Sequence, residues 1–229
     1  MNNPAVLLAG TVGSVAYGLA TPGFDIDTLG VFAAPTRDLV GLEQPQQTIA
    51  TTNPDQQLHE AAKYCHLALK GNPSVSELLW LPEELYTART PLGEQLLTIR
   101  TCFLSAPRVR DAYLGFADQQ LRRLTGRCGP HVEHRTRRRS AKHARHLARL
   151  VGQGIKLYKT GHLQVRVEDP EWIRAFGDRV ASGRTHEAAS LLIAARKVFD
   201  TSRSPLPDEP DKGPALEWLS AVRTTHWES

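Results

Sequence analysis

Near the N-terminus, two aspartates one residue apart stand in an apolar stretch, GTVGSVAYGLATPGFDIDTLGVF, at residues 10–32. On a β-strand, side chains alternate between the two faces, so Asp25 and Asp27 would share one face. Two carboxylates at that spacing repel each other, and a divalent cation between them would turn the repulsion into a binding site. The pattern therefore predicts a strand that carries a cation site.

The composition is that of an ordinary soluble globular protein. A chain of 229 residues has room for one large domain, or for a smaller domain with a helical extension. The N-terminus lacks the basic region and long apolar core of a signal peptide, and no apolar run approaches a membrane span. Cys65, Cys102 and Cys128 are widely spaced and odd in number, which predicts neither a disulfide framework nor a zinc site and favours a reducing, cytoplasmic location.

The hydrophobic pattern predicts an α+β fold with its strands near the N-terminus. Apolar runs indicate strands at 5–9, 26–34 and 46–52, and residues 13–20 suit a turn that leads into a short helix with Ser14 as its N-cap. A second helix is expected at 59–70. A third is expected to start with Ser74 as its N-cap, and Glu77, three residues on, would complete a capping box. Further helices are expected at about 136–160, 170–182, 185–199 and 215–227, with an exposed loop at 201–214. We place a domain boundary near residue 105, giving domains 1–105 and 106–229.

Positive charge is concentrated in one segment. Residues 135–149, RTRRRSAKHARHLAR, contain seven Lys or Arg and no acid, so the rest of the chain has a net charge near −3 when these seven are subtracted from +4. Arg138, Lys142, Arg145 and Arg149 recur at helical spacing and predict a cationic stripe. Such a stripe suits contact with a polyphosphate or a nucleic-acid backbone, whereas a merely solvated helix usually mixes both signs of charge.

The same helix has an apolar side and several nearby histidines. The residues expected to face a core are Ala141, Ala144, Leu147, Ala148, Leu150 and Val151. The histidines near the stripe are His131, His134, His143 and His146. Their spacing does not match a zinc motif, and we interpret them as non-ligands.

Three blocks carry a resemblance to a known group of enzymes. Gly13-Ser14, followed after ten residues by Asp25-Ile26-Asp27, resembles the signature of the DNA polymerase β-like nucleotidyltransferase superfamily. Within it, the chain is similar to predicted nucleotidyltransferases that include the RNA-repair-ligase-associated family. The matching blocks are GSVAYGLATPGFDIDTLGVFAAP, HEAAKYCHLALKGNPSVSELLW and KHARHLARLVGQGIKLYKTGHLQVRV. The resemblance implies a small mixed sheet with flanking helices, followed by a mainly helical domain.

The resemblance also implies a reaction and its metal. It is the transfer of a nucleoside monophosphate from an NTP to a hydroxyl, with release of pyrophosphate. Asp25 and Asp27 are expected to hold Mg²⁺, or Mn²⁺ in its place, in a two-metal site. A third carboxylate is expected on a later strand, where Asp55 is our choice and Glu60, beside His59, is the competitor. Phe24 and Thr28-Leu29 depart from the usual pattern around the aspartates.

The expected nucleotide-binding residues are Gly13, Ser14, Lys63, Asn72 and Lys142. The Gly13-Ser14 turn would present backbone N–H groups and a hydroxyl to the triphosphate at a helix start. Asn72-Pro73 and Glu77 are equally well explained as a helix stop and a capping box. Lys63 and Lys70 are two helical turns apart and also suit a solvated face, and Lys142 lies in the basic segment.

Several functions stay open at the level of sequence. The preferred acceptor is an RNA end, bound through the basic segment 135–149, with no membrane partner. Alternatives are transfer to a protein or a small molecule, as in an antibiotic-modifying enzyme or an antitoxin, and an inactive nucleic-acid-binding module. The residues leave the acceptor, the preferred NTP and any protein partner undecided.

Overall fold

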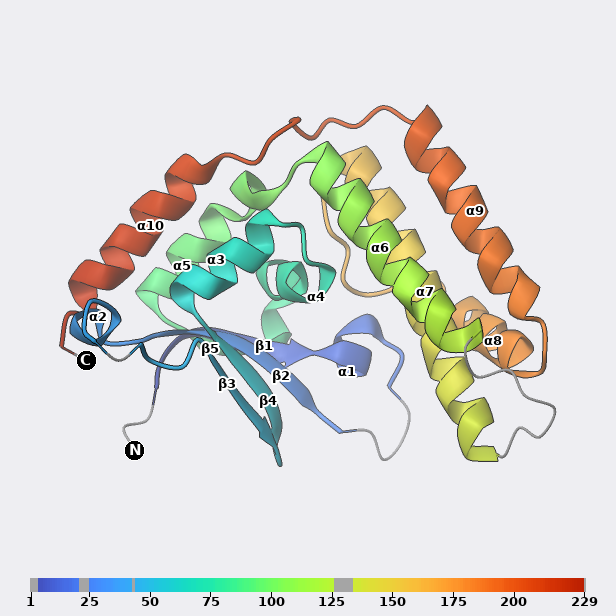
Figure 1. Cartoon of the computed structure of the whole chain (residues 1–229), viewed down its shortest axis with the longest axis horizontal. Helices are drawn as coiled ribbons and strands as arrows, with labels where there is room; N and C mark the ends of the chain where they lie inside the picture. Colours follow the sequence, from blue (N-terminus) through green and yellow to red (C-terminus); the bar gives the residue numbers. More distant parts are fainter. Residues whose placement is uncertain (1–3, 21–24, 43, 126–133, 229) are drawn as a thin grey trace. The chain divides into compact units, whose positions relative to one another are not determined.

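The computed structural model describes residues 4–20, 25–42, 44–125 and 134–228 (Figure 1). The chain divides into two compact units, one formed by Met1–Ser105 with Glu209–Ser229 and the other by Ala106–Asp208. The first unit contains a mixed sheet with helices and the second is helical, which confirms the predicted fold class. Within the described ranges, no helix is both long enough and apolar enough to cross a membrane.

A five-stranded sheet forms the centre of the first unit, in the order β3-β4-β2-β1-β5. Its strands are β1 (Ala5–Val12), β2 (Asp27–Ala33), β3 (Thr48–Thr52), β4 (Asp55–Glu60) and β5 (Tyr86–Arg89). Neighbouring strands are antiparallel, except that β2 and β4 are parallel. The three predicted strands are confirmed, since they correspond to β1, β2 and β3. In β1 and β2 consecutive residues are buried, so both faces of these two strands are covered.

The sequence patterns did not predict two of the strands, β4 and β5. β4 has the sequence DQQLHE, in which Leu58 is the one buried apolar residue, and a helix was expected to begin at His59. That expectation was wrong by two residues, since α3 begins at Ala61. β4 is specified by its pairing with β2 on one side and β3 on the other, and neither pairing leaves a local pattern.

Short helices connect and cover the strands. They are α1 (Gly13–Tyr17), α2 (Thr36–Leu39), α3 (Ala61–Leu69), α4 (Pro73–Ser76) and α5 (Pro91–Thr98), with 3₁₀ turns η1 (Glu77–Trp80), η2 (Glu83–Leu85) and η3 (Arg100–Phe103). Figure 1 shows α3 and α5 on one side of the sheet. Leu8, Val31, Leu78 and Leu96 are fully buried and form part of the core there.

The last helix, α10 (Lys212–Thr225), belongs to the first unit and not to the helical domain in which the boundary near residue 105 placed it. Its Ala215, Trp218 and Val222 are buried, and the Trp218 indole Nε1 donates to the Leu92 carbonyl at 2.8 Å. An apolar stripe on a helix is buried wherever a matching face exists. The matching face is supplied by α3, α5 and η3 of the first unit.

The second unit is built around a long central helix. α7 (His134–Thr160) packs against α6 (Ala106–Thr125), α8 (Pro170–Ala181) and α9 (Thr185–Thr201). The predicted helices at 136–160, 170–182 and 185–199 are confirmed. The predicted apolar face of α7 is also confirmed, because Ala141, Ala144, Leu147, Ala148, Leu150 and Val151 are all buried.

The predicted cationic stripe on α7 is only half exposed. Arg138 and Lys142 are exposed and Arg145 is partly buried. Arg149 is 3% exposed and donates to the Gln153 Oε1 at 2.6 Å, so the stripe does not continue to it. The reason is that α6, α8 and α9 pack against α7, and Arg149 lies on a side that they cover.

A buried imidazole lies on the same helix. The Nε2 atom of His146 is buried without a hydrogen-bond partner, and burial together with the charge of Arg149 lowers the His146 pKa to about 3. Charges on His143, Arg123 and Lys142 act in the same direction. His146 is therefore neutral in the fold throughout the ordinary pH range.

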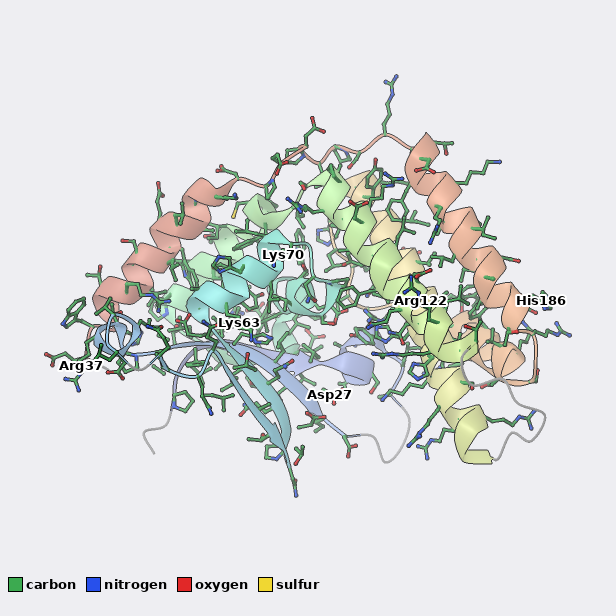
Figure 2. All side chains as sticks on the ribbon, viewed as in Figure 1. Asp27, Arg37, Lys63, Lys70, Arg122 and His186 are labelled. Atoms are coloured by element: carbon green, nitrogen blue, oxygen red, sulfur yellow. The ribbon has the colours of Figure 1, made fainter. Side chains whose placement is uncertain are left out.

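The first prediction concerns acid stability. His146 takes up a proton near pH 6.5 when unfolded but not when folded, so stability is full above pH 6.5 and falls as the pH drops. At pH 5 this site should cost about 2 kcal/mol of unfolding free energy. Urea titrations at pH 7 and 5 should show a smaller decline for His146→Gln. Substitution of the exposed His186 on α9 (Figure 2) by Gln should leave the decline unchanged, and equal declines in all three proteins would contradict the assignment.

The second prediction concerns the attachment of α10. The Arg223 Nη1 donates to the buried Glu60 Oε1 at 2.6 Å, with side-chain exposures of 21% and 3%. Arg223→Ala should lower the unfolding free energy by about 3 kcal/mol, because it strands a buried carboxylate. Arg37→Ala breaks only an exposed ion pair with Asp38 and should cost less than about 1 kcal/mol. Similar losses in the two variants, measured by chemical denaturation, would show that α10 is not held by this pair.

Candidate active site

The turn between β1 and α1 lies directly against Asp27. β1 ends at Val12, which pairs with Asp27 across the antiparallel ladder, and Gly13 follows with φ = 70°. A Cβ placed on Gly13 would overlap the Asp27 Oδ2 and lie 3.1 Å from its Cγ. The Asp27 carboxylate therefore occupies the space that any side chain at position 13 would need, and Figure 2 shows Asp27 at the start of β2 beside α1. Only glycine suits this turn.

The sequence pattern predicted Ser14 as the N-cap of α1, and this prediction was wrong. The helix begins one residue earlier, its N-cap is Val12, and that cap makes no side-chain hydrogen bond. Ser14 is partly buried, and its hydroxyl has no hydrogen-bond partner among the residues that the structure describes. The Ser14 hydroxyl, one residue after Gly13, is thus available to a ligand.

Asp25 and Asp27 are not on one strand, contrary to the opening expectation. β2 begins at Asp27, and Asp25 is exposed in the extended segment before it. The strand starts there because its partner β1 ends at Val12, opposite Asp27. The alternation argument therefore does not apply to Asp25, although it is two residues from Asp27 in the chain. Phe24 lies outside the described residues.

Asp55 is brought to a position matching that of Asp27. Asp55 is the first residue of β4 and Asp27 the first of β2, and the two strands are parallel. The register pairs Thr28 with Gln56. Asp27 directly precedes Thr28 and Asp55 directly precedes Gln56, so the two aspartates are at equivalent positions on the two strands. Asp55 is exposed and Asp27 partly buried. The topology thus places both carboxyl-bearing residues at one edge of the sheet, one strand apart.

Glu60, the competing carboxylate, is engaged in the fold. Its Oε2 accepts from the Ala62 backbone N–H at 2.8 Å, which caps α3, and its Oε1 accepts from Arg223. Both oxygens are thus occupied, and the residue is buried. Glu60 also lies at the opposite end of β4 from Asp55. These contacts favour Asp55 as the third carboxylate.

His59 and Lys63 are also at that far end. The His59 Nδ1 lies 3.0 Å from the Thr48 Oγ1, and burial together with the charge of Lys63 lowers the His59 pKa. His59 is four residues from Asp55, roughly 13 Å along a strand. The structure therefore does not bring Lys63, which follows on α3, next to Asp27 (Figure 2).

The remaining predicted nucleotide contacts have other surroundings. The Asn72 Oδ1 accepts from the backbone N–H groups of Ser74 at 3.0 Å and Val75 at 3.4 Å, so Asn72 caps α4. Ser74 is therefore not the cap, and the expected capping box with Glu77 does not form. Lys142 is exposed on α7 in the helical unit.

A tyrosine that the sequence patterns did not single out supports the turn. The Tyr17 hydroxyl on α1 donates to the Glu77 Oε2 at 2.5 Å, and Glu77 is 1% exposed. This bond joins α1 to η1 across sixty residues of sequence and holds α1 in place. In the sequence, Tyr17 and Glu77 both lie in the blocks that resemble the nucleotidyltransferases. Nothing in those blocks indicated that the two side chains form a hydrogen bond.

The carboxylates suit a hard cation without forming a complete cage. Among the described residues, no three His, Cys, Asp or Glu side chains are grouped closely enough to hold a metal ion. Mg²⁺ is usually held by one or two carboxylates, with substrate phosphates and water completing its shell. Asp27 above the Gly13 backbone, with Asp55 one strand away, fits that kind of site. Burial raises the thiol pKa of Cys65 to about 12 and of Cys102 to about 11, so neither favours metal binding.

The third prediction tests the contact between Gly13 and Asp27. Gly13→Ala and Gly161→Ala share a positive φ of 70°, which costs alanine about 1–2 kcal/mol. A Cβ on Gly161 has its nearest neighbour at 3.5 Å, whereas one on Gly13 would displace Asp27, for an extra loss of about 1–3 kcal/mol. Chemical denaturation should show this difference, and Asp27→Ala should remove it. A difference that survives in the double variant would mean that the strain lies elsewhere.

Comparison with known proteins identifies a family for this chain. A search of curated proteins finds no relative that matches. A family model described as RlaP, the RNA repair pathway DNA polymerase beta family, matches residues 1–202. The match spans the sheet, the Gly13-Ser14 turn, the aspartates and all of the helical unit through α9, and stops before α10. The name of the family indicates a nucleotidyltransferase role. This chain is therefore a member of the RlaP family of polymerase β-like proteins.

Proposed function

We propose that the protein is a Mg²⁺-dependent nucleotidyltransferase that moves a nucleoside monophosphate from an NTP to a hydroxyl. The observation that carries this proposal is the Asp27 carboxylate above the Gly13 turn, with Asp55 at the matching position of the next strand. Family membership supports the same reaction class. In this reaction the acceptor oxygen forms a bond to the α-phosphorus, and the bond from that phosphorus to the leaving pyrophosphate breaks.

Each residue at this edge of the sheet then has a role. Asp27 and Asp55, with the nearby Asp25, would hold the cation, which when bound neutralises charge on the phosphates. Asp55 accepts the proton of the acceptor hydroxyl. Ser14 donates a hydrogen bond to a phosphate oxygen, and Gly13 lets the phosphate approach the backbone.

Phosphate binding depends on this turn more than on a helix dipole. α1 has only five residues, too few for a strong macrodipole. The contacts expected of the turn are therefore local hydrogen bonds from the Ser14 hydroxyl and from backbone N–H groups. The Tyr17–Glu77 bond fixes the position of α1, so the Ser14 hydroxyl and the backbone N–H groups of the turn are oriented before substrate binds.

We further propose an RNA end as the acceptor. The family description names an RNA repair pathway, and exposed cations on α7 such as Arg138 and Lys142 suit a phosphate backbone. A second candidate is a nucleic-acid-binding module without transferase activity, because the exposed cations Arg138 and Lys142 would serve such a module equally well.

The fourth prediction separates these functions. Wild-type protein, Mg²⁺ and each of four α-labelled NTPs are offered to RNA 3′ ends, total protein and small hydroxyl compounds. We expect label on RNA. Asp27→Asn and Asp55→Asn should each reduce transfer by about 100-fold or more, since loss of a direct ligand exceeds the cost of losing an outer-shell contact. EDTA should abolish it.

Asp38→Asn is the matched control, because Asp38 is an exposed acid on α2 of the same unit. It should transfer label at the wild-type rate. Label on protein or on a small molecule would reassign the acceptor while keeping the reaction. Undiminished transfer by Asp27→Asn would place the catalytic site elsewhere, and no transfer to any acceptor would favour the binding module.

A further inference from the structure

The adjoining ends of α6 and α7 carry cations on one region of the helical unit. Two contacts show that the helices run antiparallel. The His143 Nδ1 lies 2.9 Å from the Gln120 Oε1, and a Cβ on Gly154 would meet the Tyr113 ring at 2.8 Å. Continuing this pairing places Arg123 opposite residues 140–144. Figure 2 marks the same end of α6 by Arg122.

Four side chains define what we call the α6–α7 basic surface. Arg123 on α6 and Arg138, Arg139 and Lys142 on α7 are all exposed. No carboxylate in the described part of the chain forms an ion pair with any of them. Two other arginines of α6 differ, because Arg122 pairs with Asp118 and Arg110 with Asp200, each within 2.8 Å.

This arrangement is unfavourable for an isolated helix. The first turn of α7 contains no acid, although the positive end of the helix dipole favours acids and disfavours arginines there. Arg138 and Lys142 are also four residues apart, where like charges repel. The lowered pKa of His146, to which Arg123 and Lys142 contribute, reports the same positive field inside the unit. A bound anion would relieve this repulsion.

The surroundings decide what kind of anion fits. The exposed large apolar side chains in the described ranges are Ile26, Val40, Leu42, Trp172, Ile193, Leu216 and Trp227, and none is on α6 or α7. Insertion into a membrane surface needs an exposed apolar face, and the apolar face of α7 is buried. Stacking on single-stranded bases needs exposed aromatic rings. A chain of phosphates needs only spaced cations.

We propose that the α6–α7 basic surface binds the phosphate backbone of a folded nucleic acid, without reading its sequence. The four cations are spread over two helices, which suits successive phosphates better than one compact anion. Arg145 and Arg149 do not take part, because they are turned into the unit. The inference deepens the proposed contact of α7 with a nucleic acid and rests on that part of the proposed function, but it does not need the transfer reaction and would also hold for an inactive protein.

The test is binding of fluorescent hairpins in EDTA without NTP, measured by anisotropy between 50 and 200 mM salt. The probes are an RNA hairpin and a DNA hairpin of the same sequence, each also in a scrambled version. Wild type should give a slope of log K against log salt of about −3 to −4, from four neutralised phosphates. Single changes to Gln at Arg123, Arg138, Arg139 or Lys142 should each reduce the slope by about 1, equally on both sequences.

Matched controls separate this surface from the rest of the molecule. Arg110→Gln, an exposed but ion-paired arginine on α6, should bind as wild type does. Asp27→Asn should also bind normally, so a failure of catalysis would leave this result intact. The quadruple variant should keep its helical circular dichroism, because all four side chains are exposed.

The outcomes are distinct. Loss of binding by the quadruple variant supports the proposal, and a loss confined to RNA or to DNA names the natural source of the phosphates. Wild-type binding by the folded quadruple variant overturns it. Tighter binding of wild type to vesicles containing anionic lipid than to either hairpin would also overturn it, in favour of a membrane surface.

Discussion

The arrangement of the candidate site depends on the end of one antiparallel strand pair. Because β1 stops at Val12 opposite Asp27, the chain must turn at Gly13, and the turn comes to lie against the Asp27 carboxylate. The parallel pairing of β4 with β2 then brings Asp55 to the matching position. The Tyr17–Glu77 bond joins α1 to η1. If β1 did not end opposite Asp27, the Gly13 turn would not lie at the end of the sheet where Asp27 and Asp55 meet.

Tertiary contacts also distinguish carboxylates that look alike in sequence. Glu60 and Asp55 lie at opposite ends of the same short strand. Glu60 is buried, caps α3 and pairs with Arg223, which uses both of its oxygens. Asp55 is exposed at the site edge. The difference depends on α10, which lies beyond the residues matched by the family and is nevertheless part of the unit that holds the sheet.

The helical unit shows how a charge pattern divides when it is packed. Helical spacing correctly identified the apolar face of α7 but could not say how much of its polar side stays exposed. Three neighbouring helices pack against α7, so Arg149 becomes a buried hydrogen-bond donor while Arg138 and Lys142 stay in solvent. The exposed cations are joined by Arg123 from another helix, a proximity that only the antiparallel packing creates.

By itself, the sequence determined the fold class, the family resemblance, three strands and the long helices, because apolar periodicity and glycine-rich turns are local signals. It also predicted a site at Gly13 and Asp27 from their motif, and this stays a prediction. Only the tertiary structure decided the polar strand β4, the start of β2 after Asp25, the capping role of Asn72 and the place of α10. These features depend on partners distant in sequence, and a strand, cap or ion pair made by such partners leaves no periodic pattern in the chain.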